Sequence, residues 1–185
     1  LLKASAHDII ANANPSQIIE FGSGMSRKIR HLFDACSEIE CYPTYIPFDV
    51  CDDVMVKSGN ELAEKYKWLE VAPLSGDYTA GLGNIPVVSG RNLLMFLGGT
   101  IGNFTESQGI DFLREIRELM GADDQLLLGA DRVKAPEVLH AAYNDVAGIT
   151  AEFNLNLLDV LNREMGANFD RENFAHYAFY NPDEN

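Results

Sequence analysis

The sequence lacks a long apolar run, and this absence excludes a membrane-spanning helix. No stretch approaches the roughly 20 consecutive apolar residues that such a helix needs. No charged-then-apolar leader opens the chain either. Hydrophobic residues still make up 46% of the 185 residues, an ordinary share for a globular protein. At this length one domain with a proper core is expected.

Cysteine and histidine are scarce, and neither forms a recognisable ligand pattern. The three cysteines, Cys36, Cys41 and Cys51, are odd in number and lack the C-x-x-C spacing of redox or zinc motifs. The four histidines are scattered along the chain, so we expect no metal site. Reduced cysteines of this kind are typical of a cytoplasmic protein.

Basic residues are also few. Lys and Arg number 14 against 28 Asp and Glu, which gives a formal net charge of −14. Such a surface repels phosphate backbones and anionic membranes, so nucleic-acid and lipid partners are not expected. A small or cationic ligand is compatible with this charge.

The most informative stretch is a short apolar run that ends in two glycines. Residues 17–21 are predicted to form a buried strand, Gly22, Ser23 and Gly24 the turn, and a helix is expected from Met25 onward. A strand–glycine turn–helix unit lets a ligand approach backbone N–H groups closely, although a plain tight turn would have the same pattern. Arg27 stands where the dinucleotide fingerprint has its third glycine, which argues against a nicotinamide-dependent dehydrogenase.

Strand and helix patterns alternate along the rest of the chain. Helices are expected at 1–13, 54–66, from 105, from Pro136 and up to Gly166, and strands at 42–50, 69–74, 92–97 and 125–129. Pro43 and Pro47 suggest that the 42–50 strand is irregular or partly at an edge. This alternation predicts an α/β fold with an open, mainly parallel, Rossmann-like sheet and helices on both faces.

Polar residues follow several of these strands, at the sheet edge where such folds bind ligands. Asp49 ends the second strand and can accept hydrogen bonds from ribose hydroxyls, or it is a solvated or capping residue. Asp77 and Tyr78 follow the third strand and suit an adenine ring, or form a simple turn. Lys28 is either a partner for an amino-acid carboxylate or a solvated side chain.

Together these residues form an inventory suited to S-adenosylmethionine: glycines for close approach, one acid for ribose and a second acid for adenine. No Ser-His-Asp order with a nucleophile elbow is present. Methyl transfer requires neither a metal nor that triad; it requires an in-line nucleophile in a desolvated site.

Three longer motifs carry a family resemblance: residues 20–28 (EFGSGMSRK), 96–103 (FLGGTIGN) and 142–154 (AYNDVAGITAEFN). With them, nearly the whole chain resembles the histidine-specific, S-adenosylmethionine-dependent methyltransferases of ergothioneine biosynthesis. The resemblance implies a methyltransferase core with S-adenosylmethionine as cofactor. It also implies a small-molecule substrate, L-histidine, whose α-amino group is trimethylated to give hercynine.

The resemblance assigns roles to individual residues. The positions that match the family's cofactor contacts are Gly22, Lys28, Asp49, Asp77 and Tyr78. Asn103 matches the asparagine that binds the amino-acid substrate, and Tyr143 the tyrosine that holds it. Read without the resemblance, Asn103 is a turn residue before a helix cap and Tyr143 a core aromatic.

One departure from the family is large. Its members take further substrate contacts from an N-terminal segment and from a region toward the C-terminus, and neither matches within residues 1–185. We therefore expect the chain to be the cofactor-binding core of a longer protein. Two alternatives stay open: a non-catalytic or truncated cofactor-binding module, and an N-methyltransferase of another amino acid or amine.

Overall fold

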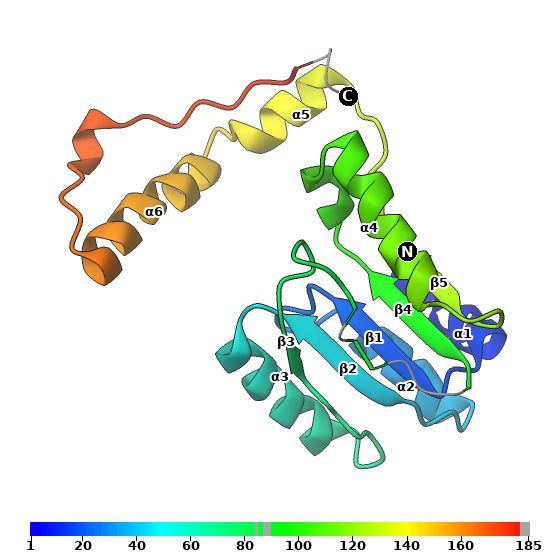
Figure 1. The fold of residues 1–185 in the computed structure, drawn as a ribbon. Helices are drawn as coiled ribbons and strands as arrows, with labels where there is room; N and C mark the ends of the chain where they lie inside the picture. Colours follow the sequence, from blue (N-terminus) through cyan, green and yellow to red (C-terminus); the bar gives the residue numbers. More distant parts are fainter. Residues whose placement is uncertain (84, 87–89, 182–185) are drawn as a thin grey trace. The chain divides into compact units, whose positions relative to one another are not determined.

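A computed structural model describes residues 1–83, 85–86 and 90–181, and these fall into two compact units. Unit 1 spans Leu1–Asp131 and unit 2 spans Arg132–Asn185. Unit 1 holds the sheet, and unit 2 contains the helices near the C-terminal end of the chain (Figure 1).

Unit 1 is built on one five-stranded sheet in which all pairs are parallel, in the order β3-β2-β1-β4-β5. The strands are β1 (Gln17–Phe21), β2 (Thr44–Asp49), β3 (Leu74–Ser75), β4 (Asn92–Phe96) and β5 (Gln125–Leu128). Every residue of β1 and β4 is buried, as expected for central strands covered on both faces. The predicted parallel α/β fold is confirmed.

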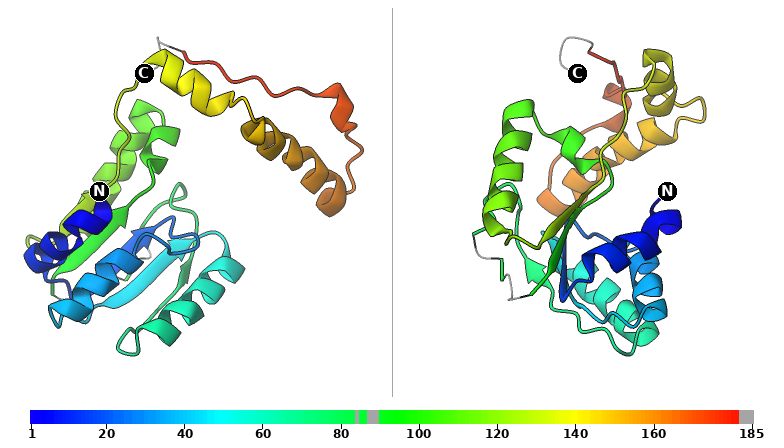
Figure 2. Two further views of the ribbon diagram at one scale, coloured as in Figure 1. Left: turned by 180° about the vertical axis from the view of Figure 1, so that it is seen from behind. Right: turned by 90° about the vertical axis from the view of Figure 1, so that its right-hand side faces the viewer.

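Helices cover both faces of this sheet, as predicted (Figure 2). The helices of unit 1 are α1 (Leu2–Ala13), α2 (Arg30–Glu38), α3 (Asp52–Lys65), the 3₁₀ helix η1 (Thr100–Asn103) and α4 (Glu106–Leu119). Side chains of α1, α2 and α3 pack with Ile18 and Tyr45 in one core cluster. Phe112 and Ile116 of α4 pack with Ile19 and Phe21 in the other. Successive side chains of β1 point to opposite faces of the sheet and thus pack into two separate cores.

Two local predictions were inaccurate, and one on strand pairing was confirmed. The helix expected from Met25 begins only at Arg30, because the turn after β1 runs on through Ser26, which has a left-handed φ of +49°. The strand expected at 69–74 is reduced to β3 and an isolated bridge between Tyr45 and Val71. The strand containing Pro47 was predicted to be irregular or partly at an edge, and on its side toward β3 it pairs only through that bridge and through Phe48 and Asp49. Pro47 has no N–H to donate, and the pairing toward β3 is interrupted between that bridge and Leu74.

Helix-end predictions were more accurate. Thr105 and Gln108 form the predicted capping box at the start of α4. Pro136 occupies the first turn of α5 (Pro136–Tyr143). Gly166, with φ +65°, caps α6 (Ile149–Met165) in the left-handed conformation. Unit 2 also contains the 3₁₀ helix η2 (Arg171–Asn173).

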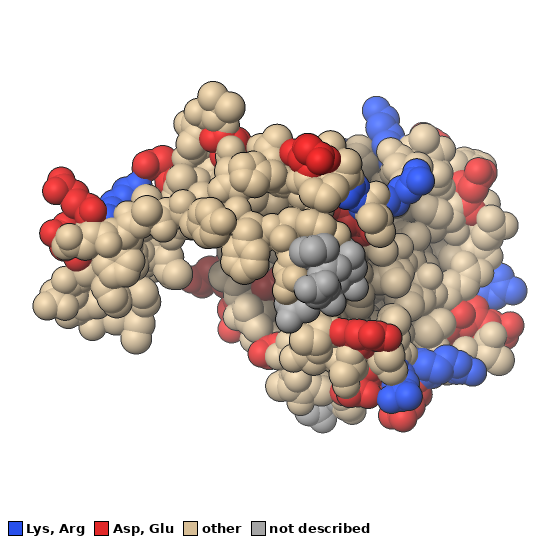
Figure 3. All heavy atoms as spheres, turned by 90° about the horizontal axis from the view of Figure 1, so that it is seen from above, with Lys and Arg blue, Asp and Glu red and all other residues tan. Residues whose placement is uncertain are grey.

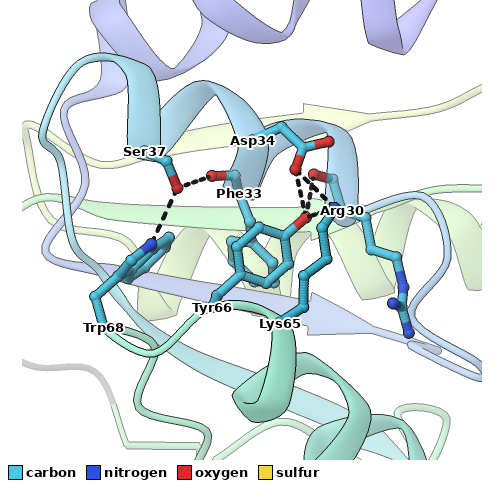
Figure 4. Close-up of polar contacts among 7 residues, drawn as sticks. All are labelled: Arg30, Phe33, Asp34, Ser37, Lys65, Tyr66 and Trp68. Carbon is cyan, nitrogen blue, oxygen red and sulfur yellow. Dashed lines mark hydrogen bonds and ion pairs between the residues drawn. The ribbon is translucent and has the colours of Figure 1, made fainter.

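A polar cluster joins α2 to the end of α3 (Figure 4). The hydroxyl of Tyr66 donates a hydrogen bond of 2.6 Å to Asp34 Oδ1 and accepts one of 2.7 Å from Lys65 Nζ. Burial opposes ionisation of Asp34, but the bonds from Tyr66 and Lys65 outweigh it and hold the pKa of this carboxyl below its usual value. The cluster ties two neighbouring helices together on one side of the sheet.

The surface is predominantly acidic. Asp and Glu side chains lie over several separate parts of the face drawn in Figure 3, in keeping with the net charge of −14. Within the described ranges, no helix combines the length and the apolar character needed to cross a bilayer.

Candidate functional site

The turn after β1 is held in an unusual backbone conformation. Gly22 and Gly24 have φ values of +66° and +49°, and Ser26 also has φ +49°. The Gly22 N–H donates to the carbonyl of Phe48 at 2.8 Å, and the Ser26 N–H to that of Ser23 at 2.9 Å. Glycine is favoured at Gly22 and Gly24 because larger residues adopt this conformation only at a cost in free energy, as Ser26 does. The turn is therefore fixed in place by the neighbouring strand.

Asp49 connects this turn to the end of β2. Its Oδ2 accepts a hydrogen bond from the Gly24 N–H at 2.9 Å, and its Oδ1 accepts one from the Cys51 N–H at 3.1 Å. A carboxylate has about four acceptor positions. After these two bonds, Asp49 can still accept hydrogen bonds from a ligand's hydroxyl groups.

A hollow of about 410 Å³ lies over the turn, lined by Glu20, Leu97 and residues 22–28. Lys28 reaches across it toward the second glycine-rich turn: a Cβ added at Gly98 would lie 2.7 Å from Lys28 Nζ. Gly98 also has φ +94°, so this position needs glycine for its conformation, and a side chain there would displace the end of Lys28. A cation is thus held at the rim between the two glycine turns.

Glu20 is a buried acid in the wall of the same hollow. Only 4% of it is exposed, and its Oε2 accepts a hydrogen bond of 2.6 Å from the Tyr45 hydroxyl. Burial raises its pKa to about 7, although the bond from Tyr45 and the charge of Lys28 act in the opposite direction. Near neutral pH, this carboxyl therefore exists in both protonation states.

A second hollow, also of about 410 Å³, shares Gly22 with the first and is lined by Asp49, Asp77, Tyr78 and Thr100 among others. A Cβ on Gly22 would lie 3.6 Å from Tyr78 Cε1, so the ring stands directly beside the turn. The Tyr78 ring is held edge-to-face on Phe96, with ring centroids 5.4 Å apart. An aromatic wall and two carboxylates thus flank this space.

Asp77 also has a local structural role. Its Oδ1 accepts hydrogen bonds from the Thr79 hydroxyl at 2.7 Å and the Thr79 N–H at 2.8 Å. These bonds lower the pKa of Asp77, which is exposed and ionised at neutral pH. Both bonds go to the same oxygen, Oδ1. Asp77 can therefore stabilise the turn and still accept a hydrogen bond from a ligand through Oδ2.

The two predicted substrate residues lie in different units. Asn103 is exposed at the end of η1, in the segment that follows β4. Tyr143 ends α5 in unit 2, is 60% exposed, and lines a hollow of about 360 Å³ with Tyr177 and Phe179. Its carbonyl oxygen lies 2.7 Å from His176 Nε2. Asn103 thus belongs to unit 1 and Tyr143 to unit 2.

The structure therefore gathers all seven predicted cofactor residues around two adjoining hollows: Gly22, Ser23, Gly24, Lys28, Asp49, Asp77 and Tyr78. No role of Glu20, Ser26 or Tyr45 was predicted from the sequence. An acidic residue just before the glycine turn was a usable signal for Glu20, but Tyr45 has the pattern of an ordinary strand residue. Among the residues described, no three His, Cys, Asp or Glu side chains are grouped so as to hold a metal ion.

Comparison with known proteins gives a consistent result. The family described as histidine-specific, SAM-dependent methyltransferase matches residues 1–185. The chain is 42% identical over 184 residues to the histidine N-alpha-methyltransferase of Mycolicibacterium smegmatis, covering 100% of this chain and 57% of that protein. It is 38% identical over 181 residues to the enzyme of the same name from Mycobacterium tuberculosis, covering 98% of this chain and 56% of the relative.

Among solved structures, LaPhzM is similar with a TM-score of 0.50 at 20% identity, covering 80% of this chain and 44% of that one. This likeness concerns the fold alone. The chain spans 57% and 56% of the length of the two mycobacterial relatives. The match over all 185 residues confirms the resemblance seen in the sequence: the chain belongs to the histidine-specific, S-adenosylmethionine-dependent methyltransferase family.

Proposed function

We propose that the protein is an S-adenosylmethionine-dependent N-methyltransferase that trimethylates the α-amino group of L-histidine to hercynine. The names of its mycobacterial relatives support this substrate. The observation that carries the proposal is structural: Gly22 is shared by two hollows, and the turn it opens is bonded to Asp49 and flanked by Tyr78.

The residues present fit this cofactor. Gly22 and Gly24 leave the backbone open to close approach, since a Cβ on Gly24 would meet nothing within 4 Å. Asp49 would accept from the ribose hydroxyls, Tyr78 would pack against the adenine ring, and Lys28 would pair with the amino-acid carboxylate. When bound, S-adenosylmethionine supplies a methyl group on a sulfonium that an amine can attack.

Asn103 and Tyr143 would orient the amino acid. Positioning is the main source of acceleration in such a reaction, where effective molarities of about 10⁵ M or more are available. The amine must lose a proton before each of the three attacks, because an ammonium group has no lone pair. Aromatic side chains such as Tyr143 also tolerate the positive charge that remains on nitrogen after methylation.

The test is direct. The full product of the gene is incubated with L-histidine and S-adenosylmethionine, and the products are identified by mass spectrometry. We expect mono-, di- and trimethylated histidine to appear in succession. Absence of methylated histidine, with S-adenosylhomocysteine still bound in calorimetry, would leave a cofactor-binding module and overturn the proposed reaction. Preferential methylation of another amine would overturn the proposed substrate.

A further inference from the structure

Beneath the glycine turn lies a chain of hydrogen bonds that the proposed reaction does not use. Tyr45 is completely buried in β2, and its hydroxyl lies 2.6 Å from Glu20 Oε2 and 3.0 Å from Ser26 Oγ. Glu20 is the penultimate residue of β1, and Ser26 lies within the turn that follows it. One phenol therefore contacts both the carboxylate in the hollow and the backbone segment that forms it.

The direction of these bonds follows from counting protons. When Glu20 is ionised it can only accept, so Tyr45 donates its single proton to it. The Tyr45 oxygen must then accept from Ser26, whose hydroxyl is the remaining donor. The bonds thus run from Ser26 to Tyr45 to Glu20, in the order expected for a polarised, mutually strengthening series.

Ser26 is the point where this series restrains the backbone. It is 1% exposed and has φ +49°, a conformation that costs a non-glycine residue free energy and persists where surrounding contacts impose it. Ser58 Oγ of α3 lies 3.4 Å from Ser26 Oγ and itself donates to the carbonyl of Met55 at 3.2 Å. The shorter bond to Tyr45 is therefore the principal side-chain restraint on Ser26.

We propose that Tyr45 is a positioning residue of the cofactor site, which holds Ser26 in its left-handed conformation and favours the ionised form of the Glu20 carboxyl in the wall of the hollow. The inference rests on the proposed cofactor function and adds a regulatory property to it. A cationic ligand, such as one carrying an α-ammonium group, binds better to ionised than to protonated Glu20. Ligand binding is consequently coupled to loss of the Glu20 proton.

The charges around Glu20 agree with this coupling. Lys28 favours its ionised form and Asp49 opposes it, while Tyr45 is the neutral donor that contacts it. Burial raises the pKa of Glu20 to about 7, so the carboxyl changes state in the physiological range. Removing the Tyr45 hydroxyl would raise that pKa further, because its hydrogen bond stabilises the charged form.

The experiment measures the affinity of the full-length protein for S-adenosylhomocysteine by calorimetry from pH 5.5 to 8.5. For the natural protein we expect affinity to rise with pH through about pH 7 and to level off about one pH unit higher, with proton release detectable in buffers of different ionisation enthalpy. For Tyr45→Phe we expect affinity about fivefold lower at pH 7, because a pKa raised by about one unit lowers the ionised fraction of Glu20 from about a half to about a tenth, and recovery toward the natural value at pH 8.5.

Two further variants make the result decisive. Glu20→Gln cannot titrate and should show a flat profile over this range, whether or not Tyr45→Phe folds. Tyr66→Phe is the matched control, because it removes a tyrosine–carboxylate bond of the same length, to Asp34, outside both hollows. Its pH profile should follow that of the natural protein.

A natural protein that binds with no pH dependence, or a Tyr45→Phe variant with an unshifted midpoint, would overturn the positioning role while leaving the cofactor function intact. Failure of the natural protein to bind at any pH would instead overturn the proposed function, and the inference with it.

Discussion

The Asp49 carboxylate accepts a hydrogen bond of 2.9 Å from the Gly24 N–H, and so joins two residues separated by 25 positions in the chain. The same side chain was expected to contact the ribose of the cofactor. Asp49 thus stabilises the turn before any ligand arrives, and its remaining acceptor capacity faces the hollow that it lines. Preorganisation of this kind lowers the entropic cost of ligand binding.

Asp49→Asn should therefore weaken cofactor binding in two ways, by removing the charge and by leaving one carboxylate acceptor fewer for the Gly24 and Cys51 N–H groups. We expect affinity for S-adenosylhomocysteine to fall by about 10- to 100-fold, or about 1.4–2.8 kcal/mol. Calorimetry at pH 7.5 measures the dissociation constant of S-adenosylhomocysteine. Asp53→Asn, in the first turn of α3, is the control. Equal affinities for Asp49→Asn and the control would contradict the ribose role.

Gly98→Ala should affect both stability and binding. The new methyl group would lie 2.7 Å from Lys28 Nζ, and φ +94° is unfavourable for alanine. We expect a loss of about 1–3 kcal/mol in the free energy of unfolding, and several-fold weaker binding because Lys28 is displaced. Urea denaturation and calorimetry measure the two effects. Gly102→Ala, where a Cβ meets nothing within 4 Å, should change neither by a comparable amount.

Tyr66→Phe tests the polar cluster between α2 and α3 (Figure 4). Loss of the hydroxyl leaves Asp34 without its 2.6 Å partner and should cost about 1 kcal/mol at pH 7. The pKa of Asp34 is lowered in the folded protein, so its stabilisation is present above the unfolded pKa of 3.8 and is lost as pH falls through the folded value. Denaturation curves at pH 7 and pH 3 should show the difference between the two proteins shrinking at the lower pH.

Glu20 should make the stability of the unliganded protein depend on pH in the opposite direction. Because its folded pKa is raised from 4.5 to about 7, the folded state keeps a proton that the unfolded chain has released. The free energy of unfolding should fall between pH 4.5 and 7, by at most about 1.4 kcal/mol per pH unit from this group, and level off above. Glu20→Gln should lack this component. Parallel curves for the two proteins across the window would contradict the raised pKa.

The parts of the fold that depend on local patterns were predictable. The buried run in β1, the capping box at Thr105 and the C-cap at Gly166 each have a signature within a few residues, and the structure confirms them. The short β3 was predicted too long, because a strand's extent depends on its partner, and Pro47 of β2 offers no N–H on that side.

The candidate site likewise has a part that local patterns predict and a part that they do not. Strand ends predicted where Asp49, Asp77 and Tyr78 would gather, because parallel strands bring their carboxyl ends to one edge. The bond from Gly24 to Asp49 and the series through Tyr45 could not be predicted. Both depend on the register between β1 and β2, in which Ile18 lies opposite Tyr45, and no local pattern records that register.

The exposure of Cys51, whose N–H donates to Asp49, has a practical consequence. Cys51 is the exposed cysteine of the three, whereas Cys36 and Cys41 are buried. Within these 185 residues a thiol-reactive fluorophore would therefore attach at one position, two residues from the acid expected to meet the ribose. Cofactor titrations could then be followed by emission in the natural sequence, without engineering a labelling site.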